Sequence, residues 1–140
     1  MINISFSFDC ESKWGMLDNH NSIYVSKINH QDLIFTYERL LSLFEKYDAK
    51  ATFGFVASML LNFEHWKETV LPLTNDQTKK WIEPIFLRKT DLNDYFLPDL
   101  KNVFIGRNFE IASHSLTHVP HGEIEADLSA CNLEMSLSKK

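Results

Sequence analysis

Apolar and polar residues alternate at the start of the chain, and this pattern predicts a β-strand. The apolar positions are Ile2, Ile4, Phe6 and Phe8. The alternation has the period of an extended chain and differs from the basic segment and apolar run of a signal peptide. Residues 51–57 (ATFGFVA) are a short apolar run that predicts a buried second strand, and residues 109–112 predict a third.

Between the first two strands the sequence predicts a loop and then a helix. Residues 12–29 are polar and have no traceable apolar period, which indicates a long loop. A helix is expected to begin near Asn29, a good N-cap residue, with Asp32 in its first turn. Its apolar face would comprise Leu33, Tyr37, Leu40, Leu41, Phe44 and Tyr47.

Further helices are expected after the second and third strands. Met59, Leu60, Phe63 and Trp66 have helical spacing, and a second helical pattern covers residues 74–88, where Pro84 is expected to interrupt it. Residues 123–137 predict a last helix, with its inner face made of Ile124, Leu128, Cys131 and Met135. This order predicts an α/β fold, with parallel strands joined by crossover helices in a single domain over residues 1–140.

Composition narrows the function classes. The formal charge of −5 on 140 residues gives no general attraction to phosphate backbones, which argues against nucleic-acid binding. The apolar runs are too short for a membrane span. Two cysteines are too few for a disulfide framework, and the chain starts within its first strand, so we expect a cytoplasmic protein.

Two polar clusters follow predicted strands, where parallel α/β proteins gather their functional side chains. Asp9 and Glu11 come after the first strand, and His114 and His118 come after the third. Two histidines four residues apart with a carboxylate are suitable ligands for a divalent metal that retains an open position. Asp9 and Glu11 point to the same side of an extended segment, so one can bind the metal while the other accepts a proton.

Three neighbouring residues have two interpretations each. Cys10 is either a small buried residue or a thiolate ligand, and the alternation favours burial. Trp14 either lines the site and contacts the substrate or packs in the core. His121 follows His118 by three residues and is either a further metal ligand or a loop residue, and we interpret it as a loop residue.

The residues around both clusters resemble the polysaccharide deacetylase family. Residues 4–11 (ISFSFDCE) resemble its first motif, residues 50–55 (KATFGF) its second strand, and residues 109–118 (FEIASHSLTH) its second motif. The three matches follow the family's order along the chain. The Asp-Cys-Glu sequence replaces the two adjacent aspartates of the commonest family form and is similar to an Asp-x-Glu subset.

The resemblance implies an enzyme and a set of roles. Asp9 would be the general base, and Glu11, His114 and His118 would bind the metal, most plausibly Zn²⁺, with Co²⁺, Ni²⁺ or Mn²⁺ as alternatives. The implied reaction is hydrolysis of an N-acetyl group on a sugar, a nucleotide sugar or another glycan precursor, in surface polysaccharide biosynthesis. The implied fold is a distorted (β/α) barrel.

The matched motifs cover the N-terminal half of such a barrel. The family's later motifs supply an aromatic residue and a further histidine, and they would follow His118, where 22 residues remain. A complete eight-stranded barrel takes ~250 residues. We therefore expect a partial barrel that is completed by further sequence or by a second chain, or a truncated form that binds without turnover. Uncovered strand edges would favour a homo-oligomer.

Three other functions are compatible with the sequence. The chain could bind metal or carbohydrate without catalysis, or it could be a structural α/β module whose histidines are bystanders. A glycosidase that uses Asp9 and Glu11 is disfavoured, because two carboxylates two residues apart on one strand do not readily flank a sugar.

Overall fold

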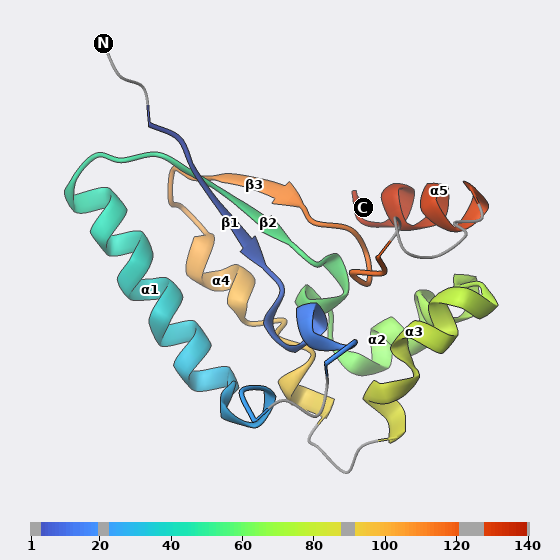
Figure 1. Ribbon diagram of the computed structural model, residues 1–140. Helices are drawn as coiled ribbons and strands as arrows, with labels where there is room; N and C mark the ends of the chain where they lie inside the picture. Colours follow the sequence, from blue (N-terminus) through green and yellow to red (C-terminus); the bar gives the residue numbers. More distant parts are fainter. Residues whose placement is uncertain (1–3, 20–22, 88–91, 121–127, 140) are drawn as a thin grey trace.

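Three parallel strands form the sheet of this protein. In the computed structural model, β1 (Phe6–Cys10) pairs with β2 (Ala51–Phe55), and β2 pairs with β3 (Glu110–Ser113) (Figure 1). The predicted α/β class with parallel strands is confirmed. The described strands form an open sheet, so closure into a barrel stays a prediction. The structure describes residues 4–19, 23–87, 92–120 and 128–139.

Helices connect the strands and extend beyond their carboxyl ends (Figure 1). The α-helices are α1 (His30–Lys46), α2 (Phe63–Thr69), α3 (Asp76–Leu87), α4 (Leu100–Phe104) and α5 (Leu128–Leu137). Short 3₁₀ helices cover Ser12–Met16, Val25–Lys27, Ala57–Leu60, Leu71–Leu73 and Leu92–Asp94.

The first helix confirms the prediction from its cap and its apolar face. The side chain of Asn29 accepts a hydrogen bond from the backbone N–H of Asp32 at 2.9 Å, which satisfies one of the free donors of the first turn. Leu41 and Phe44 are buried on the inner side of the helix. The local sequence thus determines where α1 begins and which of its sides faces the sheet.

One face of the sheet is apolar and is covered by α1 and α4. Phe53 of β2 is fully buried, and its ring lies 5.1 Å from the ring of Phe8 and 5.1 Å from that of Phe104 in α4. Tyr37 of α1 lies 5.8 Å from Phe104, ring to ring. Packed aromatic rings bury much apolar area, so this layer holds the two helices against the strands.

The opposite face of the sheet carries small and polar residues. The register aligns Asp9 with Gly54 and Gly54 with Ala112 across the three strands. Asp9 is exposed, and the other two are partly exposed. The residues of this face are therefore more exposed than Phe53 on the apolar face. The strands end at the residues that follow Cys10 in β1 and Ser113 in β3.

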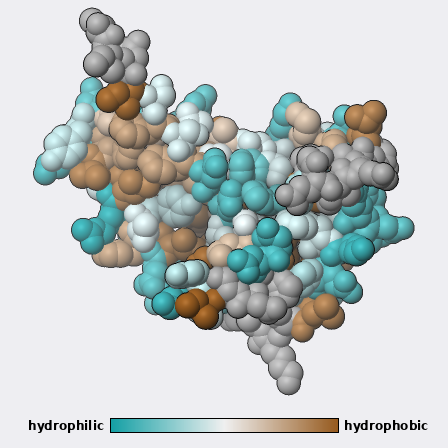
Figure 2. All heavy atoms as spheres, in the orientation of Figure 1, coloured by the Kyte–Doolittle hydropathy of each residue, from teal (hydrophilic) through white to brown (hydrophobic). Residues whose placement is uncertain are grey.

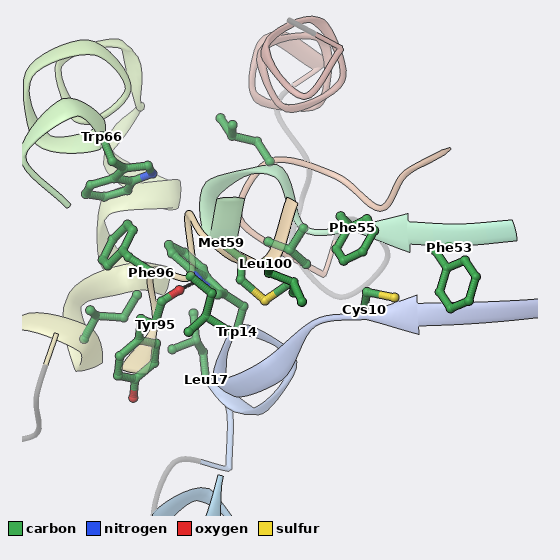
Figure 3. Packing of buried hydrophobic residues seen from close by; sticks show 14 of the residues in the cluster. Cys10, Trp14, Leu17, Phe53, Phe55, Met59, Trp66, Tyr95, Phe96 and Leu100 are labelled. Atoms are coloured by element: carbon green, nitrogen blue, oxygen red, sulfur yellow. Dashed lines mark hydrogen bonds between the residues drawn. The ribbon is translucent and has the colours of Figure 1, made fainter. Parts of the chain in front are cut away.

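A second part of the core lies beyond the ends of β1 and β2 (Figure 3). Trp14 packs there against Phe96, with 5.7 Å between ring centroids, and its indole N–H donates to the Tyr95 carbonyl at 2.7 Å. The interpretation of residues 12–29 as a loop was therefore wrong in part. Trp14, Leu17 and Val25 are buried, and their three isolated positions produce no helical or strand period in the sequence.

The segment after β2 is broken into two short helices where one was expected. The 3₁₀ helix Ala57–Leu60 ends at Leu61, and Asn62 caps α2 by accepting from the backbone N–H of His65 at 2.8 Å. The helix expected over residues 74–88 is confirmed as α3, which spans Asp76–Leu87 and continues through Pro84, so the expected interruption is absent from α3.

The last helix turns a different face inward from the one predicted. Leu128 is 78% exposed and Met135 is 58% exposed, whereas Ala130 and Glu134 are buried. The prediction failed because it assigned the inner face by hydrophobicity. A buried carboxylate, that of Glu134, lies on the inner face instead and accepts hydrogen bonds from Leu116 and Thr117. Ile124 lies outside the described residues.

Hydrophobic side chains gather at the surface where β1 begins, beside the C-terminal end of α1 (Figure 2). The exposed residues in these segments include Ile4, Phe6, Leu43 and Tyr47. Within the described residues, β1 pairs with β2 alone, so its outer edge is free of strand partners. None of the helices described is both long enough and apolar enough to cross a membrane.

Candidate metal centre

The sheet brings the two predicted polar clusters together. Glu11 directly follows β1, and His114 directly follows β3. The central strand joins them: the backbone N–H of His114 donates to the Phe55 carbonyl at 2.8 Å, and that of Val56 donates to the Cys10 carbonyl at 3.2 Å. Strand ends that are far apart in sequence thus lie side by side at one edge.

Glu11, His114 and His118 converge on one point, and we call these three residues the metal-ligand set. The Nε2 atoms of His114 and His118 each lie 3.0 Å from Oε1 of Glu11. One potential ligand atom from each residue lies within 4.8 Å of the other two. The two imidazole rings are 5.1 Å apart and inclined by 43°. These three residues could hold a metal ion.

The distances fit a small divalent cation. Ligand atoms at ~2.1 Å from a tetrahedral zinc ion are separated from one another by about 3.4 Å. The two separations of 3.0 Å between Glu11 and the imidazoles would need to grow by a few tenths of an ångström, and the potential ligand atoms of the two histidines lie within 4.8 Å of each other. Without an ion, the same carboxylate oxygen accepts hydrogen bonds from the imidazoles, so a metal and the Nε2 protons would compete for one position.

Two glycines make room for this arrangement. A Cβ at Gly54 would lie 3.5 Å from Cβ of His114, so the side chain of His114 lies over the central strand at this position. A Cβ at Gly15 would lie 1.8 Å from Oε2 of Glu11 and 2.8 Å from its Cδ. Glu11 therefore occupies the space that any other residue at position 15 would need.

Residues 114–118, which we call the histidine segment, form an unusual turn. Ser115 has φ 69° and His118 has φ 60°, both in the left-handed region that costs a residue other than glycine about 1–3 kcal/mol. The backbone N–H groups of Ala57 and Ser58 donate to the carbonyls of Ser115 and Leu116 at 3.0 Å each. The N–H of His118 donates to Oγ of Ser115 at 2.9 Å. The segment is therefore held by several independent contacts.

Backbone strain is concentrated around the metal-ligand set. Among the described residues other than glycine, four have positive φ, namely Ser12, Asp48, Ser115 and His118. Three of these four lie at the metal-ligand set, because Ser12 follows Glu11, Ser115 follows His114, and His118 belongs to the set. Strain of this kind persists where the surrounding structure holds a functional geometry, and it favours a functional role for these two segments.

The remaining sequence candidates take different positions. Asp9 is exposed and pairs in register with Gly54, the residue over which the side chain of His114 lies, and its role as a base stays a prediction. Trp14 is fully buried and packs in the core, so the structure favours its packing role over substrate contact. His65 lies in α2, and His30 begins α1. His121 lies outside the described residues.

Cys10 has the environment of a core residue. Its side chain is 1% exposed, and burial raises the pKa of the thiol from 9.0 to about 11, while the Tyr37 hydroxyl opposes this in part. Burial likewise raises the pKa of Tyr37. Its thiol donates to the Phe8 carbonyl at 3.5 Å, and Cys10 is not among the residues whose ligand atoms converge, so burial is the better of the two interpretations of Cys10.

Glu134 is the site-associated residue that the sequence did not reveal. Its carboxylate accepts hydrogen bonds from the middle of the histidine segment, although it lies 16 residues beyond His118. A glutamate within a helical pattern is most simply interpreted as solvent-facing, and no spacing distinguishes this one from Glu123 or Glu125.

No model of a protein family matches this sequence, and no curated protein or solved structure matches it.

Proposed function

We propose that this protein is a metal-dependent hydrolase that removes the acetyl group from an N-acetylated sugar. The observation that carries the proposal is the convergence of Glu11, His114 and His118 at the carboxyl ends of parallel strands, with Asp9 on the same face. The resemblance of both segments to polysaccharide deacetylase motifs supports the substrate class. Zn²⁺ is the proposed ion, because a carboxylate and two imidazoles are ligands that it accepts readily.

The metal-ligand set would hold the ion from one side. A divalent ion supplies Lewis acidity, which polarises an amide carbonyl and makes a water molecule a better nucleophile near neutral pH. Glu11 and the histidines come from strands separated by β2, so the sheet fixes their spacing. On this face Asp9 is exposed and Ala112 is partly exposed, so a substrate could approach the metal-ligand set from this side of the sheet.

Asp9 would act as the base. Its carboxylate precedes Glu11 by two residues, so both acids project from the same side of the β1 segment. Asp9 would accept a proton from the attacking water as the new C–O bond forms. The amide C–N bond then breaks, the sugar amine takes up a proton, and acetate is released. The matched motifs do not assign the proton donor for the amine.

A second candidate function is binding of metal or carbohydrate without turnover. It rests on the metal-ligand set alone, which could hold an ion whether or not Asp9 takes part in a reaction. The two candidates share the metal-ligand set and differ in their products. Only the hydrolase releases acetate.

The test combines metal analysis with an acetate assay. The purified chain and a His114→Ala, His118→Ala double variant are dialysed together against Zn²⁺ buffer and then metal-free buffer. A His65→Ala variant provides the matched control, because His65 lies in α2 outside the metal-ligand set. We expect about one equivalent of zinc in the wild type and in the control, and none in the double variant.

The same proteins are then incubated with N-acetylglucosamine oligosaccharides and with a nucleotide sugar. Acetate release by the wild type and the control alone would support the hydrolase. Stoichiometric zinc without acetate from any substrate would favour the binding function. Equal zinc in all three proteins would overturn the metal centre itself.

A further inference from the structure

Glu134 is a buried carboxylate outside the metal-ligand set. Its side chain is 1% exposed. Its Oε2 atom accepts hydrogen bonds from the backbone N–H groups of Leu116 at 3.0 Å and Thr117 at 2.8 Å. Its Oε1 atom accepts from the Thr117 hydroxyl at 2.6 Å. All three donors lie between His114 and His118, so the carboxylate binds the middle of the segment whose two ends carry the imidazoles.

The contacts of Glu134 complement those made by the segment after β2. Ala57 and Ser58 hold two carbonyl groups of the histidine segment, whereas Glu134 holds two of its N–H groups. The Trp81 indole N–H donates to the Thr117 carbonyl at 3.0 Å. A buried carboxylate is costly unless its oxygens are hydrogen-bonded, and these three donors satisfy it. The strained turn is therefore held by contacts to both its carbonyl and its N–H groups, and the N–H groups of Leu116 and Thr117 depend on one side chain of α5.

We propose that Glu134 is a positioning residue that holds the histidine segment in the conformation that aims His114 and His118 at Glu11. Through this contact the docking of α5, which lies beside the loop leaving β3 (Figure 1), is coupled to metal binding. The inference rests on the proposed metal centre. Partners that orient metal ligands from outside the ligand set typically contribute about 10–100-fold to metal affinity.

Two substitutions separate the role of the carboxylate from the general stability of α5. Glu134→Ala leaves the N–H groups of Leu116 and Thr117 without their acceptor. Glu134→Gln keeps one oxygen for these groups, and its amide can donate to the Thr117 hydroxyl. Zinc affinity, measured by titration calorimetry, is expected to fall about 10–100-fold in the alanine variant and less in the glutamine variant.

Two controls address stability. Asn132→Ala changes an exposed residue of α5, and Leu41→Val trims a buried residue of α1, which covers the apolar face of the sheet. Both should bind zinc like the wild type, although Leu41→Val unfolds at a lower temperature. Wild-type affinity in Glu134→Ala would overturn the inference. If Glu134→Ala does not fold, Glu134→Gln and Thr117→Val decide, and wild-type affinity in both would overturn it.

Imidazole NMR distinguishes failure of this inference from failure of the proposed function. The ring resonances of His114 and His118 report their contacts with Glu11 whether or not zinc binds. If the wild type binds no zinc, the proposed function fails, and the Glu134 role is judged by these resonances alone. They should change in Glu134→Ala and stay as in the wild type in Asn132→Ala. Unchanged resonances in Glu134→Ala would refute the positioning role.

Discussion

Gly15 lies directly against the carboxylate of Glu11, so that a Cβ at position 15 would lie 1.8 Å from Oε2. This contact comes from the 3₁₀ helix Ser12–Met16, which folds back over the residue that precedes it. The backbone N–H of Trp14 donates to the Glu11 carbonyl at 3.0 Å and closes this turn. The absence of a side chain at Gly15 is therefore part of the metal centre.

Gly15→Ala is expected to displace Glu11 and weaken metal binding. The new methyl group overlaps Oε2, Cβ and Cδ of Glu11, so the carboxylate must leave its position between the two histidines. We expect a loss of zinc affinity of at least 10-fold, comparable to the loss of an orienting contact. Titration calorimetry measures this directly.

Gly106→Ala is the matched control for that experiment. Gly106 has φ 78°, and nothing lies within 4 Å of a Cβ built there, so alanine meets backbone strain without a steric clash. The control should lower the free energy of unfolding by about 1 kcal/mol and leave zinc affinity unchanged. Equal zinc affinity in both alanine variants would contradict the role of Gly15.

Asp9→Asn should separate catalysis from metal binding. The amide has nearly the size of the carboxylate but cannot accept a proton from water, so the rate of acetate release should fall by ~10²–10⁴-fold. Asp9 is outside the metal-ligand set, and zinc content should stay as in the wild type. An active Asp9→Asn enzyme would remove Asp9 from the mechanism.

Cys10 should resist alkylation and should make stability depend on alkaline pH. The thiol has a pKa of about 11 in the folded protein against 9.0 when solvated, because burial disfavours the thiolate. Its contribution to stability is therefore complete below pH 9 and is lost as the pH rises to about 11. Iodoacetamide labelling followed by peptide mass spectrometry should modify Cys10 at pH 8 in guanidinium, with little modification of the native protein.

A Cys10→Ser variant checks the alkaline effect. Urea unfolding measures the free energy of unfolding at pH 8.5 and at pH 10.5. The decrease between these two pH values should be smaller in the variant than in the wild type, by on the order of 2 kcal/mol. Rapid labelling of Cys10 in the native protein at pH 8 would show instead that the thiol is accessible.

The outer edge of β1 should promote self-association. Phe6 and Ile4 are exposed along an edge strand whose described partner is β2 alone, and such edges pair readily with other chains. Phe6→Lys should lower the weight-average mass measured by sedimentation equilibrium. Ile105→Lys, which changes an exposed residue after α4, should leave the mass unchanged. A wild-type chain that stays monomeric at high concentration would contradict this prediction.

Local signals made the strands, α1 and the metal-ligand set predictable. The Asn29 cap acts within one turn, and the alternation around Phe8 reports directly which side chains face the helices. The convergence of Glu11 with His114 followed from parallel pairing, because parallel strands end at the same edge. These features depend on neighbouring residues or on a general rule of sheet topology.

Contacts between distant segments were not predictable. Trp14 lies in a polar stretch, and its burial depends on Tyr95 and Phe96, which lie at least 81 residues later in the sequence. The inner face of α5 was predicted wrongly, since three hydrogen bonds to Glu134 outweigh the hydrophobicity of Leu128 and Met135. A pattern of apolar residues does not reveal a buried polar contact.

The central strand contributes a glycine to the metal centre and otherwise acts as its spacer. A slip of β2 by one residue against β1 alone would place a phenylalanine instead of Gly54 beside Asp9, and it would shift Glu11 along the sheet relative to His114 by about 3.3 Å. Acquisition of zinc affinity therefore requires that both outer strands have paired in the native register. In a refolding experiment, a fluorescent zinc indicator would time the completion of the sheet, independently of when the helices form.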